Sequence, residues 1–494
     1  MKLGHLWIKN YKNVRNCKIE FAQASLITAI IGSNGSGKSN LIEAILHILI
    51  GVYFKKAPPF EFEFQYEAQG RNVLLQCERG KLLAEVDGAQ VPIRRFAERL
   101  REGPAQVNYP ELTFVYYSGE CQRVRDLIKR YRRDFQKLTR KPETDRFRPL
   151  FVESSNEQSQ LILLALFAHG HEQFLEHFGL EGIVDVSLML RSPAGFDPKK
   201  HEPKLWNTEG TVRRIVAAID ETASTQDSKR DEKGAFDELL FDNEAFDTKS
   251  SYSEMRTYGF LDEPRKGIRE LARRLSGSND NVYLAFENLR ARNILVSVDF
   301  RLKGRDAAEP FPFEQLSEGE KQLLAVVGAL RLTNQQDNLV LLDEPDTHLN
   351  PHWSWDYPGM LTEAFKKEQK LRSTVLMATH DPVMISGLVS DQVLLAHPPS
   401  DETPMFTRPR RNPRGQGIAN ILCSSEFFGL PSSLDKETQK LLDERLDISI
   451  KPKLTREDKM RLKELNQQLE IITPGVSERD PSFVEFLRQR HTAK

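Results

Sequence analysis

A glycine-rich segment between two apolar stretches is the strongest constraint on the fold of this chain. Residues 32–39 read Gly-Ser-Asn-Gly-Ser-Gly-Lys-Ser and match the pattern G-x-x-x-x-G-K-[ST]. Residues 25–31 are apolar and β-branched, as in a buried parallel strand, and residues 41–50 have the apolar spacing of a helix. Such a loop aims backbone N–H groups at phosphate oxygens, next to the positive end of a helix dipole. The sequence therefore predicts a strand, a phosphate-binding loop and a helix, in that order.

The loop contains the residue types that bind a nucleotide. Lys38 is expected to contact the β- and γ-phosphates, and the Ser39 hydroxyl is expected to ligate Mg²⁺. The other nucleotide-binding residues expected here are Asn34, Gly35, Ser36, Gly37 and Asn40. The alternative, a chance glycine-rich turn, is disfavoured because strand, loop and helix occur in the right order.

Two further strands are expected to end in polar residues. Residues 339–342 are apolar and lead into Asp343 and Glu344, which suit a Mg²⁺ ligand and a general base for the attacking water. The next expected strand, 374–378, leads to His380. Because ligands of open α/β sheets bind beyond the carboxyl ends of the strands, His380 is placed to approach the γ-phosphate. The alternatives are a solvent-facing acidic pair and a structural histidine.

A third motif precedes the acidic strand. Residues 316–321 read Leu-Ser-Glu-Gly-Glu-Lys and open a helix, so a capping box of Ser317 and Glu320 explains them on local grounds. Their position resembles the signature motif of ABC-type ATPases, with Glu318 and Glu320 in place of the usual Gly and Gln. The resemblance implies an ATP clamped between two protomers, contacted in trans by Ser317, Gly319 and Glu320. Residues 346–350 follow as the family's D-loop does, although Asn350 stands where Asp is usual.

The N-terminus points to one branch of that family. Residues 6–14 resemble the first strand and turn of RecF, SMC and OLD-like ATPases, which makes Lys12 a nucleotide-binding candidate; an exposed turn lysine is the alternative. Gln122, after an expected strand at 112–117, is the candidate for the glutamine that ligates Mg²⁺ in this family.

The expected fold is an α/β, ABC-type P-loop ATPase head with a mixed sheet flanked by helices. Its halves are residues 1–118 and 280–400, separated by a helical insert or lid at 119–279. A basic linker and helical tail at 401–494 would serve assembly or docking. Within these parts, the polar segment 221–256 is expected to be a loop. Residues 432–445 and 455–472 are expected to form a helical hairpin, and 481–487 an amphipathic helix.

Composition excludes some classes of protein. The net charge of −1 gives no global basic field, so contact with DNA would need a local patch. One such patch extends from Arg123 to Arg148, with Tyr131 and Phe135 interleaved; a solvated helix face that binds a partner protein is equally compatible. The four cysteines form no C-x-x-C pair, so neither a zinc site nor a disulfide framework is expected. No apolar run approaches the ~20 residues of a membrane span, which favours a cytoplasmic protein.

The chain also resembles the ATPases of the Septu and PARIS anti-phage systems. This resemblance implies an enzyme that hydrolyses ATP with Mg²⁺ and self-associates through its heads, with a higher oligomer possible. It also implies a sensor or scaffold role that controls a separately encoded nuclease. The alternatives are a RecF-like DNA-repair ATPase, the motor of an ABC transporter, and a single-chain OLD-type nuclease. The last would need an acidic metal-binding domain after the histidine strand.

Overall fold

The computed structural model describes residues 1–472 apart from several short segments and one longer segment. Those segments are 23–24, 103–107, 119–121, 140–148, 154–155, 194–195, 197–203, 232–252, 262, 277–280, 334–336, 366–372, 400–403 and 452. The expected amphipathic helix at 481–487 lies outside the described residues, as does the end of the basic segment, 140–148.

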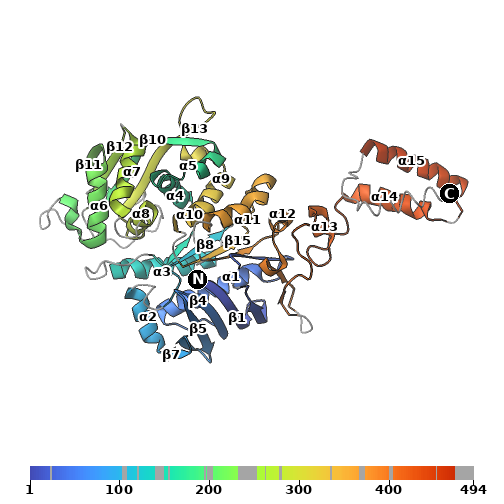
Figure 1. The fold of residues 1–494 in the computed structure, drawn as a ribbon, viewed down its shortest axis with the longest axis horizontal. Coiled ribbons are helices and arrows are strands. Elements are labelled where there is room, and N and C mark those ends of the chain that lie inside the picture. Colours follow the sequence, from blue (N-terminus) through green and yellow to red (C-terminus); the bar gives the residue numbers. More distant parts are fainter. Residues whose placement is uncertain are drawn as a thin grey trace.

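The strands of the described chain form three sheets (Figure 1). In sheet order, the seven-stranded sheet contains β18 (Phe406–Thr407), β17 (Val393–Ala396), β3 (Ile27–Gly32), β16 (Thr374–Ala378), β15 (Asn338–Asp343), β8 (Leu112–Tyr117) and β9 (Phe151–Glu153). The six-stranded sheet contains β2 (Val14–Glu20), β1 (Lys2–Tyr11), β4 (Phe62–Ala68), β5 (Arg71–Glu78), β6 (Lys81–Val86) and β7 (Ala89–Val91). The five-stranded sheet contains β11 (Thr225–Asp231), β12 (Ser253–Phe260), β10 (Leu180–Arg191), β13 (Leu295–Gly304) and β14 (Phe311–Pro312).

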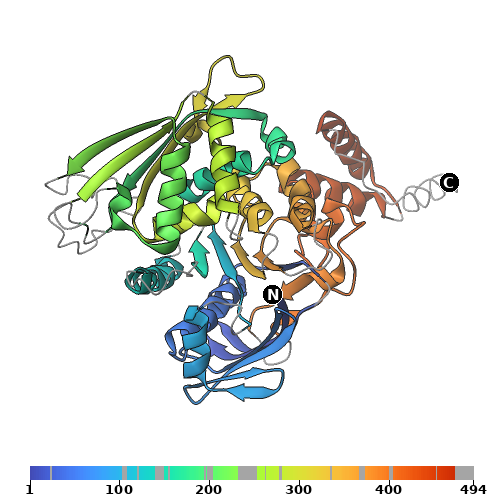
Figure 2. The same cartoon turned by 60° about the vertical axis from the view of Figure 1, so that its left-hand side comes forward.

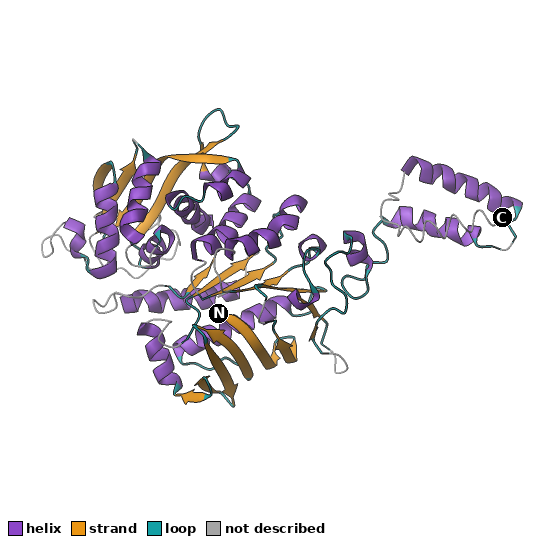
Figure 3. Cartoon of the chain, in the orientation of Figure 1, coloured by secondary structure: helices purple, strands orange, loops and turns teal. Residues whose placement is uncertain are grey.

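Most helices pack around these sheets, and the last two form the tail (Figure 3). They are α1 (Lys38–Phe54), α2 (Ile93–Glu102), α3 (Gln122–Thr139), α4 (Asn156–Ala168), α5 (Glu172–Leu175), α6 (Gly210–Thr222), α7 (Pro264–Leu275), α8 (Val282–Ala291), α9 (Glu318–Leu323), α10 (Ala329–Thr333), α11 (Pro351–Phe365), α12 (Pro382–Ile385), α13 (Ile418–Cys423), α14 (Lys436–Ser449) and α15 (Arg456–Ile472). A π-helical turn, Leu324–Gly328, joins α9 to α10 in one continuous helix.

The seven-stranded sheet carries the expected phosphate loop and acidic strand. Its strands are parallel except for β18, which pairs antiparallel with β17. The register places Asp343 beside Ala378 of β16 and beside Tyr117 of β8. The carboxyl ends of β3, β15 and β16 therefore meet at one edge of the sheet, as the sequence predicts.

Both faces of this sheet are buried, which explains its continuous apolar strands. Ile30, Leu341 and Leu376 face one core, shared with α1 and the six-stranded antiparallel sheet. Val340 and Met377 face the second core, shared with α4, α11 and the five-stranded sheet. Neighbouring residues of a strand therefore enter different cores, as the two-residue period of a strand requires.

The insert contains strands as well as the expected helices. Its five-stranded antiparallel sheet and helices α6 and α7 together form the lid (Figure 2). Two of the lid strands, β13 and β14, come from beyond residue 279, so the lid sheet crosses the expected domain boundary. The expectation of a loop at 221–256 is wrong at both ends of this segment. There β11 and β12 pair antiparallel, with Thr225 opposite Gly259 and Asp231 opposite Ser253. The middle of that segment lies outside the described residues.

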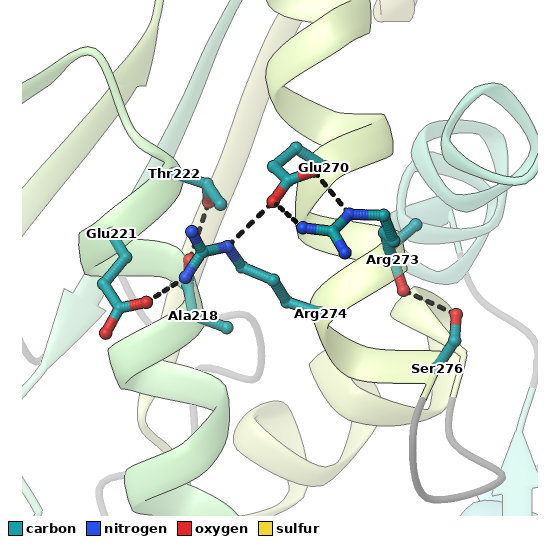
Figure 4. A network of polar contacts seen from close by, with 8 residues as sticks. Ala218, Glu221, Thr222, Glu270, Arg273, Arg274 and Ser276 are labelled. Atoms are coloured by element: carbon teal, nitrogen blue, oxygen red, sulfur yellow. Dashed lines mark hydrogen bonds and ion pairs between the residues drawn. The ribbon is translucent and has the colours of Figure 1, made fainter.

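The outer surface of the lid carries ion pairs within α7 and between α7 and α6 (Figure 4). Glu270 accepts hydrogen bonds from Arg273 and Arg274, and Arg274 also pairs with Glu221 of α6. The Arg273 side chain is 73% exposed. Exposed pairs of this kind contribute little to stability, so the buried apolar residues between these helices and the sheet hold the lid together.

The tail forms the expected helical hairpin of α14 and α15 and extends away from the rest of the chain (Figures 1 and 3). Before it, the basic segment at 408–414 lies against the core, where Arg408 donates a hydrogen bond to the Glu20 carbonyl. In the described part of the chain, no helix is both long enough and apolar enough to span a bilayer.

Candidate functional site

The phosphate loop adopts the expected conformation between β3 and α1. Gly35 and Gly37 have φ of 80° and 96°, a region that residues with a β-carbon rarely adopt. A β-carbon at Gly32 would lie 2.2 Å from the carbonyl oxygen of Ala396. Glycine is thus needed at 32 because β17 approaches closely, and at 35 and 37 because the chain turns.

Lys38 lies within the curve of this loop. Its Nζ donates hydrogen bonds to the carbonyl oxygens of Gly32 (2.9 Å) and Ser33 (3.1 Å). Burial lowers the pKa of Lys38, while the carboxylates of Glu344 and Asp343 act in the opposite direction. These two acids therefore favour the charged form of the lysine that is expected to bind phosphate.

Ser39 and Asp343 meet although 304 positions separate them. Ser39 Oγ donates a hydrogen bond of 2.9 Å to Asp343 Oδ1. Burial raises the pKa of Asp343 to about 6, although this hydrogen bond opposes the shift. A hydroxyl and a carboxylate side by side are oxygen ligands of the kind that Mg²⁺ prefers, so the pair fits this cation. Ser36 Oγ, in the same loop, is buried and has no hydrogen-bond partner among the described residues, which fits a bound phosphate.

Glu344 and His380 form the second pair at this edge. His380 Nε2 lies 3.1 Å from Glu344 Oε1. Burial and the charge of Lys38 lower the pKa of His380, while Glu344 raises it. Glu344 has φ of 50°, and its N–H donates to the Ala378 carbonyl at 2.8 Å. This left-handed turn directs Glu344 away from the strand axis and towards the histidine that follows β16.

A third buried polar contact lies nearby, between Thr379 and Asp346, the first residue of the expected D-loop, and sequence reasoning missed this contact. Thr379 Oγ1 donates to Asp346 Oδ1 at 2.9 Å and accepts from the N–H of Asp381 at the same distance. Burial raises the pKa of Asp346 to about 6. The signal was present in the sequence, since Asp346 follows the acidic pair by two residues and Thr379 precedes His380.

Asn13 is a second residue that sequence reasoning missed. Its Nδ2 donates to the Gly35 carbonyl, and its Oδ1 accepts a 2.6 Å hydrogen bond from Asn40. Asn13 thus joins the β1–β2 turn to the phosphate loop. The only sequence signal was its place directly after Lys12.

Two of the expected site residues, Lys12 and Gln122, contact side chains outside the phosphate loop. Lys12 forms an ion pair with Glu43, a buried residue of α1 that also accepts a hydrogen bond from Tyr11. Gln122 Nε2 donates to Asp126 of its own helix at 2.9 Å. Neither contact reaches the phosphate loop, so both assignments stay predictions.

The signature residues form the capping box that local sequence explains. Ser317 Oγ accepts from the Glu320 N–H, and Glu320 Oε2 accepts from the Ser317 N–H at 2.7 Å. A β-carbon at Gly319 would lie 2.6 Å from the carbonyl oxygen of His348. The glycine therefore allows α9 to contact the loop after β15, and Ser317 is exposed at the surface.

The aromatic residues of the basic segment are core residues. Tyr131 and Phe135 of α3 are buried, together with Val124 and Ile128 on the same helix face. The Tyr131 hydroxyl accepts a hydrogen bond from the Leu150 N–H at 2.7 Å. These rings pack inside the protein, so any nucleic-acid contact here would depend on the basic side chains of the other face.

Two family models match the chain. One, described as "AAA ATPase domain", matches residues 1–144, and the other, "AAA domain, putative AbiEii toxin, Type IV TA system", matches residues 220–386. Together with the loop, the acidic strand and the signature, they decide the identification. The chain has the fold of an ABC-type P-loop ATPase and resembles SMC/OLD-like defence ATPases.

Two curated proteins are similar to parts of the chain. The Septu protein PtuA of Bacillus mycoides is 24% identical over 180 residues, 35% of this chain and 24% of that protein. The Retron Vc95 probable ATPase of Vibrio cholerae is 25% identical over 226 residues, 44% of this chain and 40% of that protein. The chain therefore covers less than half the length of each relative.

Solved structures with partial likeness include two Smc head domains, each bound to part of ScpA. For the first, the TM-score is 0.37, with 13% identity over 83% of this chain and 97% of that one. For the second, whose title names Pyrococcus furiosus, the TM-score is 0.36, with 14% identity over 82% of this chain and 96% of that one.

Proposed function

We propose that this protein binds and hydrolyses ATP in the presence of Mg²⁺. The observation that carries the proposal is the meeting of two polar pairs beside Lys38: Ser39 with Asp343, and Glu344 with His380. These residues come from the ends of three different structural elements and converge on the loop that is built for phosphate.

Each of these residues has a distinct role in the proposed reaction. Lys38 and the loop N–H groups bind the phosphates, and Ser39 and Asp343 would hold Mg²⁺, which neutralises phosphate charge when bound. Glu344 accepts a proton from the attacking water. His380, through its contact with Glu344, holds that carboxylate in position. It follows β16 at the same edge of the sheet, from which it would approach the γ-phosphate.

The active form is a head dimer, in which Ser317, Gly319 and Glu320 face the nucleotide of the partner. Residues 1–118 and 280–400 supply most of each head, 119–279 most of the insert, and 401–494 the segment for assembly or docking. The exceptions are β9, an insert segment in the head sheet, and β13 and β14, which come from beyond residue 279 but belong to the lid sheet. The exposure of Ser317 supports this arrangement. Lys12 and Gln122 would join the site only after leaving Glu43 and Asp126.

The biological role that we propose is that of a sensor or scaffold subunit in a bacterial anti-phage system. Similarity to a Septu protein and to a retron ATPase supports it. In this role the ATP-dependent dimer controls a separately encoded nuclease. A RecF-like repair ATPase is the second candidate, supported by the exposed basic side chains of α3.

One pull-down tests these roles against each other. Tagged Glu344→Gln protein is recovered from its source cell with ATP and Mg²⁺, and the eluate is analysed by mass spectrometry and nucleic-acid staining. Lys38→Ala protein, which is expected not to bind ATP, is the matched control. A stoichiometric nuclease in the Glu344→Gln eluate supports the defence role, whereas DNA without a protein partner supports the repair role.

A further inference from the structure

A buried glutamine connects the signature helix to the segment that carries the proposed general base. Gln322 lies on α9, five residues after Ser317, and the residue is 4% exposed. Its Nε2 donates a hydrogen bond to the carbonyl oxygen of Pro345, the residue directly after Glu344. Its Oε1 has no hydrogen-bond partner among the described residues, so the bond from Nε2 is the polar contact that holds this buried side chain in place.

A second contact joins the same two segments. Gly319, one turn before Gln322, lies so close to the His348 carbonyl that a β-carbon would approach it to 2.6 Å. Helix α9 is therefore in contact with the loop after β15 at two points, Pro345 and His348. A displacement of the signature turn has to move this loop or break both contacts.

Glu344 depends on that loop for its orientation. It has a positive φ of 50°, and its carbonyl accepts hydrogen bonds from the N–H and the hydroxyl of Thr347, the latter at 2.9 Å. Non-glycine residues keep such a conformation only where their surroundings hold it. The contact with His380 fixes the end of the side chain, while Gln322 and Thr347 fix the backbone that follows.

We propose that Gln322 is a positioning residue that couples the orientation of Glu344 to the position of the signature turn in the same protomer. This inference rests on the proposed function, in which that signature contacts the nucleotide of the partner. The proton acceptor in one site then responds to the nucleotide in the other site. The path is short: signature turn, Gln322 amide, Pro345 carbonyl, Glu344.

The first test is Gln322→Met in the full-length chain. Methionine keeps the length and approximate volume of glutamine but removes the N–H donor. We expect kcat for ATP hydrolysis to fall about 10- to 100-fold, because small displacements of a catalytic group have effects of this size. We expect KM and the ATP-dependent dimer to change by less than about threefold, since the phosphate loop and signature turn are intact.

Gln173→Met is the matched control, because Gln173 is a helical glutamine exposed on α5, away from the site and from the tail. It should leave kcat unchanged, and thermal melting without nucleotide checks that both variants are folded. A wild-type kcat in a folded Gln322→Met protein overturns the inference. The inference is also overturned if Gln322→Met keeps the wild-type kcat but has a higher KM or a weaker ATP-dependent dimer.

Mixed dimers distinguish an effect of Gln322 on Glu344 of its own protomer from an effect on the signature. In a dimer of Gln322→Met with Glu344→Gln, the one intact base belongs to the Gln322→Met protomer, and the rate should fall below that of wild type paired with Glu344→Gln. When both changes are in one protomer and the partner is wild type, the rate should equal that reference. The inference is overturned if the first dimer has the reference rate and the second falls below it. That result would show that Gln322 only supports the signature.

Failure of the proposed function looks different. If wild-type protein hydrolyses no ATP, or if Glu344→Gln hydrolyses it normally, the ATPase assignment or the base is wrong irrespective of Gln322. If wild type is active, Glu344→Gln is inactive and Gln322→Met behaves as wild type, then only the positioning role fails.

Discussion

The nucleotide edge of the seven-stranded sheet and the outer surface of the lid use the same residue types in different ways. At the edge, Asp343 is largely buried, and burial raises its pKa to about 6. On the lid, Glu270 pairs with two arginines in contact with solvent. A carboxylate kept from water is poised to bind a cation or accept a proton, whereas an exposed ion pair mainly keeps the surface soluble. Burial of the carboxyl group, more than the type of acidic residue, therefore distinguishes the candidate site from the surface of the lid.

The largest effect is expected from Lys38→Ala at the nucleotide edge. Loss of the ammonium removes the charge that meets the phosphates, so ATP binding should fall about 100-fold or more and hydrolysis should become undetectable. Isothermal titration with ATP and Mg²⁺ measures the binding. Lys9→Ala, at an exposed lysine of β1, should bind as wild type does. Normal ATP binding by Lys38→Ala would show that the nucleotide does not bind at this edge of the sheet.

Glu344→Gln should separate binding from chemistry. Glutamine keeps the shape of the side chain but cannot accept the proton, so we expect kcat to fall about 100- to 10,000-fold. ATP binding should remain, and the closed dimer should accumulate, as measured by light scattering with ATP and Mg²⁺. Normal hydrolysis by this variant would show that another group is the general base.

Asp346→Asn tests whether burial acts on the acids of the edge as described. Burial raises the pKa of Asp346 to about 6, above its ordinary value, so the folded protein holds this proton more tightly than the unfolded chain. The resulting stability is present below about pH 4 and is lost as pH rises through about 6. The variant should therefore be more stable than wild type at neutral pH, by at most about 3 kcal/mol.

Urea unfolding of the nucleotide-free protein at several pH values measures this difference. The advantage of Asp346→Asn should shrink as pH falls from about 6 to below about 4, where the wild-type side chain becomes protonated in the unfolded chain as well. A difference that is constant with pH would show that the Asp346 carboxylate is not penalised by burial.

The smallest effect is expected from Glu270→Gln on the lid. It makes the same chemical change as Glu344→Gln, but at an exposed position that pairs with Arg273 and Arg274. We expect a shift in melting temperature of about 2 °C or less and an unchanged rate of ATP hydrolysis. A large loss of activity would mean that the lid surface takes part in the reaction, and the contrast between the two regions would no longer hold.

Much of the nucleotide edge was predictable because its signals are local. A phosphate loop needs glycine at particular turns, and a strand buried on both faces needs a continuous apolar run; both are visible in neighbouring residues. The common location of Asp343, Glu344 and His380 followed from the rule that the carboxyl ends of parallel strands meet at one edge, whereas the hydrogen bonds between particular side chains did not. The assignments of Lys12 and Gln122 rested on resemblance alone, and the structure pairs both residues elsewhere.

The lid sheet was not predictable in the same way. Residues 225–231 read Thr-Gln-Asp-Ser-Lys-Arg-Asp, a polar segment without the apolar alternation of a half-buried strand. It is an edge strand, β11, and its pairing with β12 comes from backbone hydrogen bonds that side chains do not reveal. Tyr131 and Phe135 show the converse case, because only packing against the core distinguishes them from exposed rings in a basic segment.

By itself the sequence determined the conformations that depend on a few consecutive residues: the phosphate loop, the capped signature helix, the buried parallel strands and the tail hairpin. The tertiary structure alone decided which distant groups meet. It placed Thr379 against Asp346 and Gln322 against Pro345, and it paired β13 with β10 in the lid. The physical reason is that local propensity acts over one turn or strand, whereas burial, pKa shifts and hydrogen bonds between remote segments arise only when the chain packs.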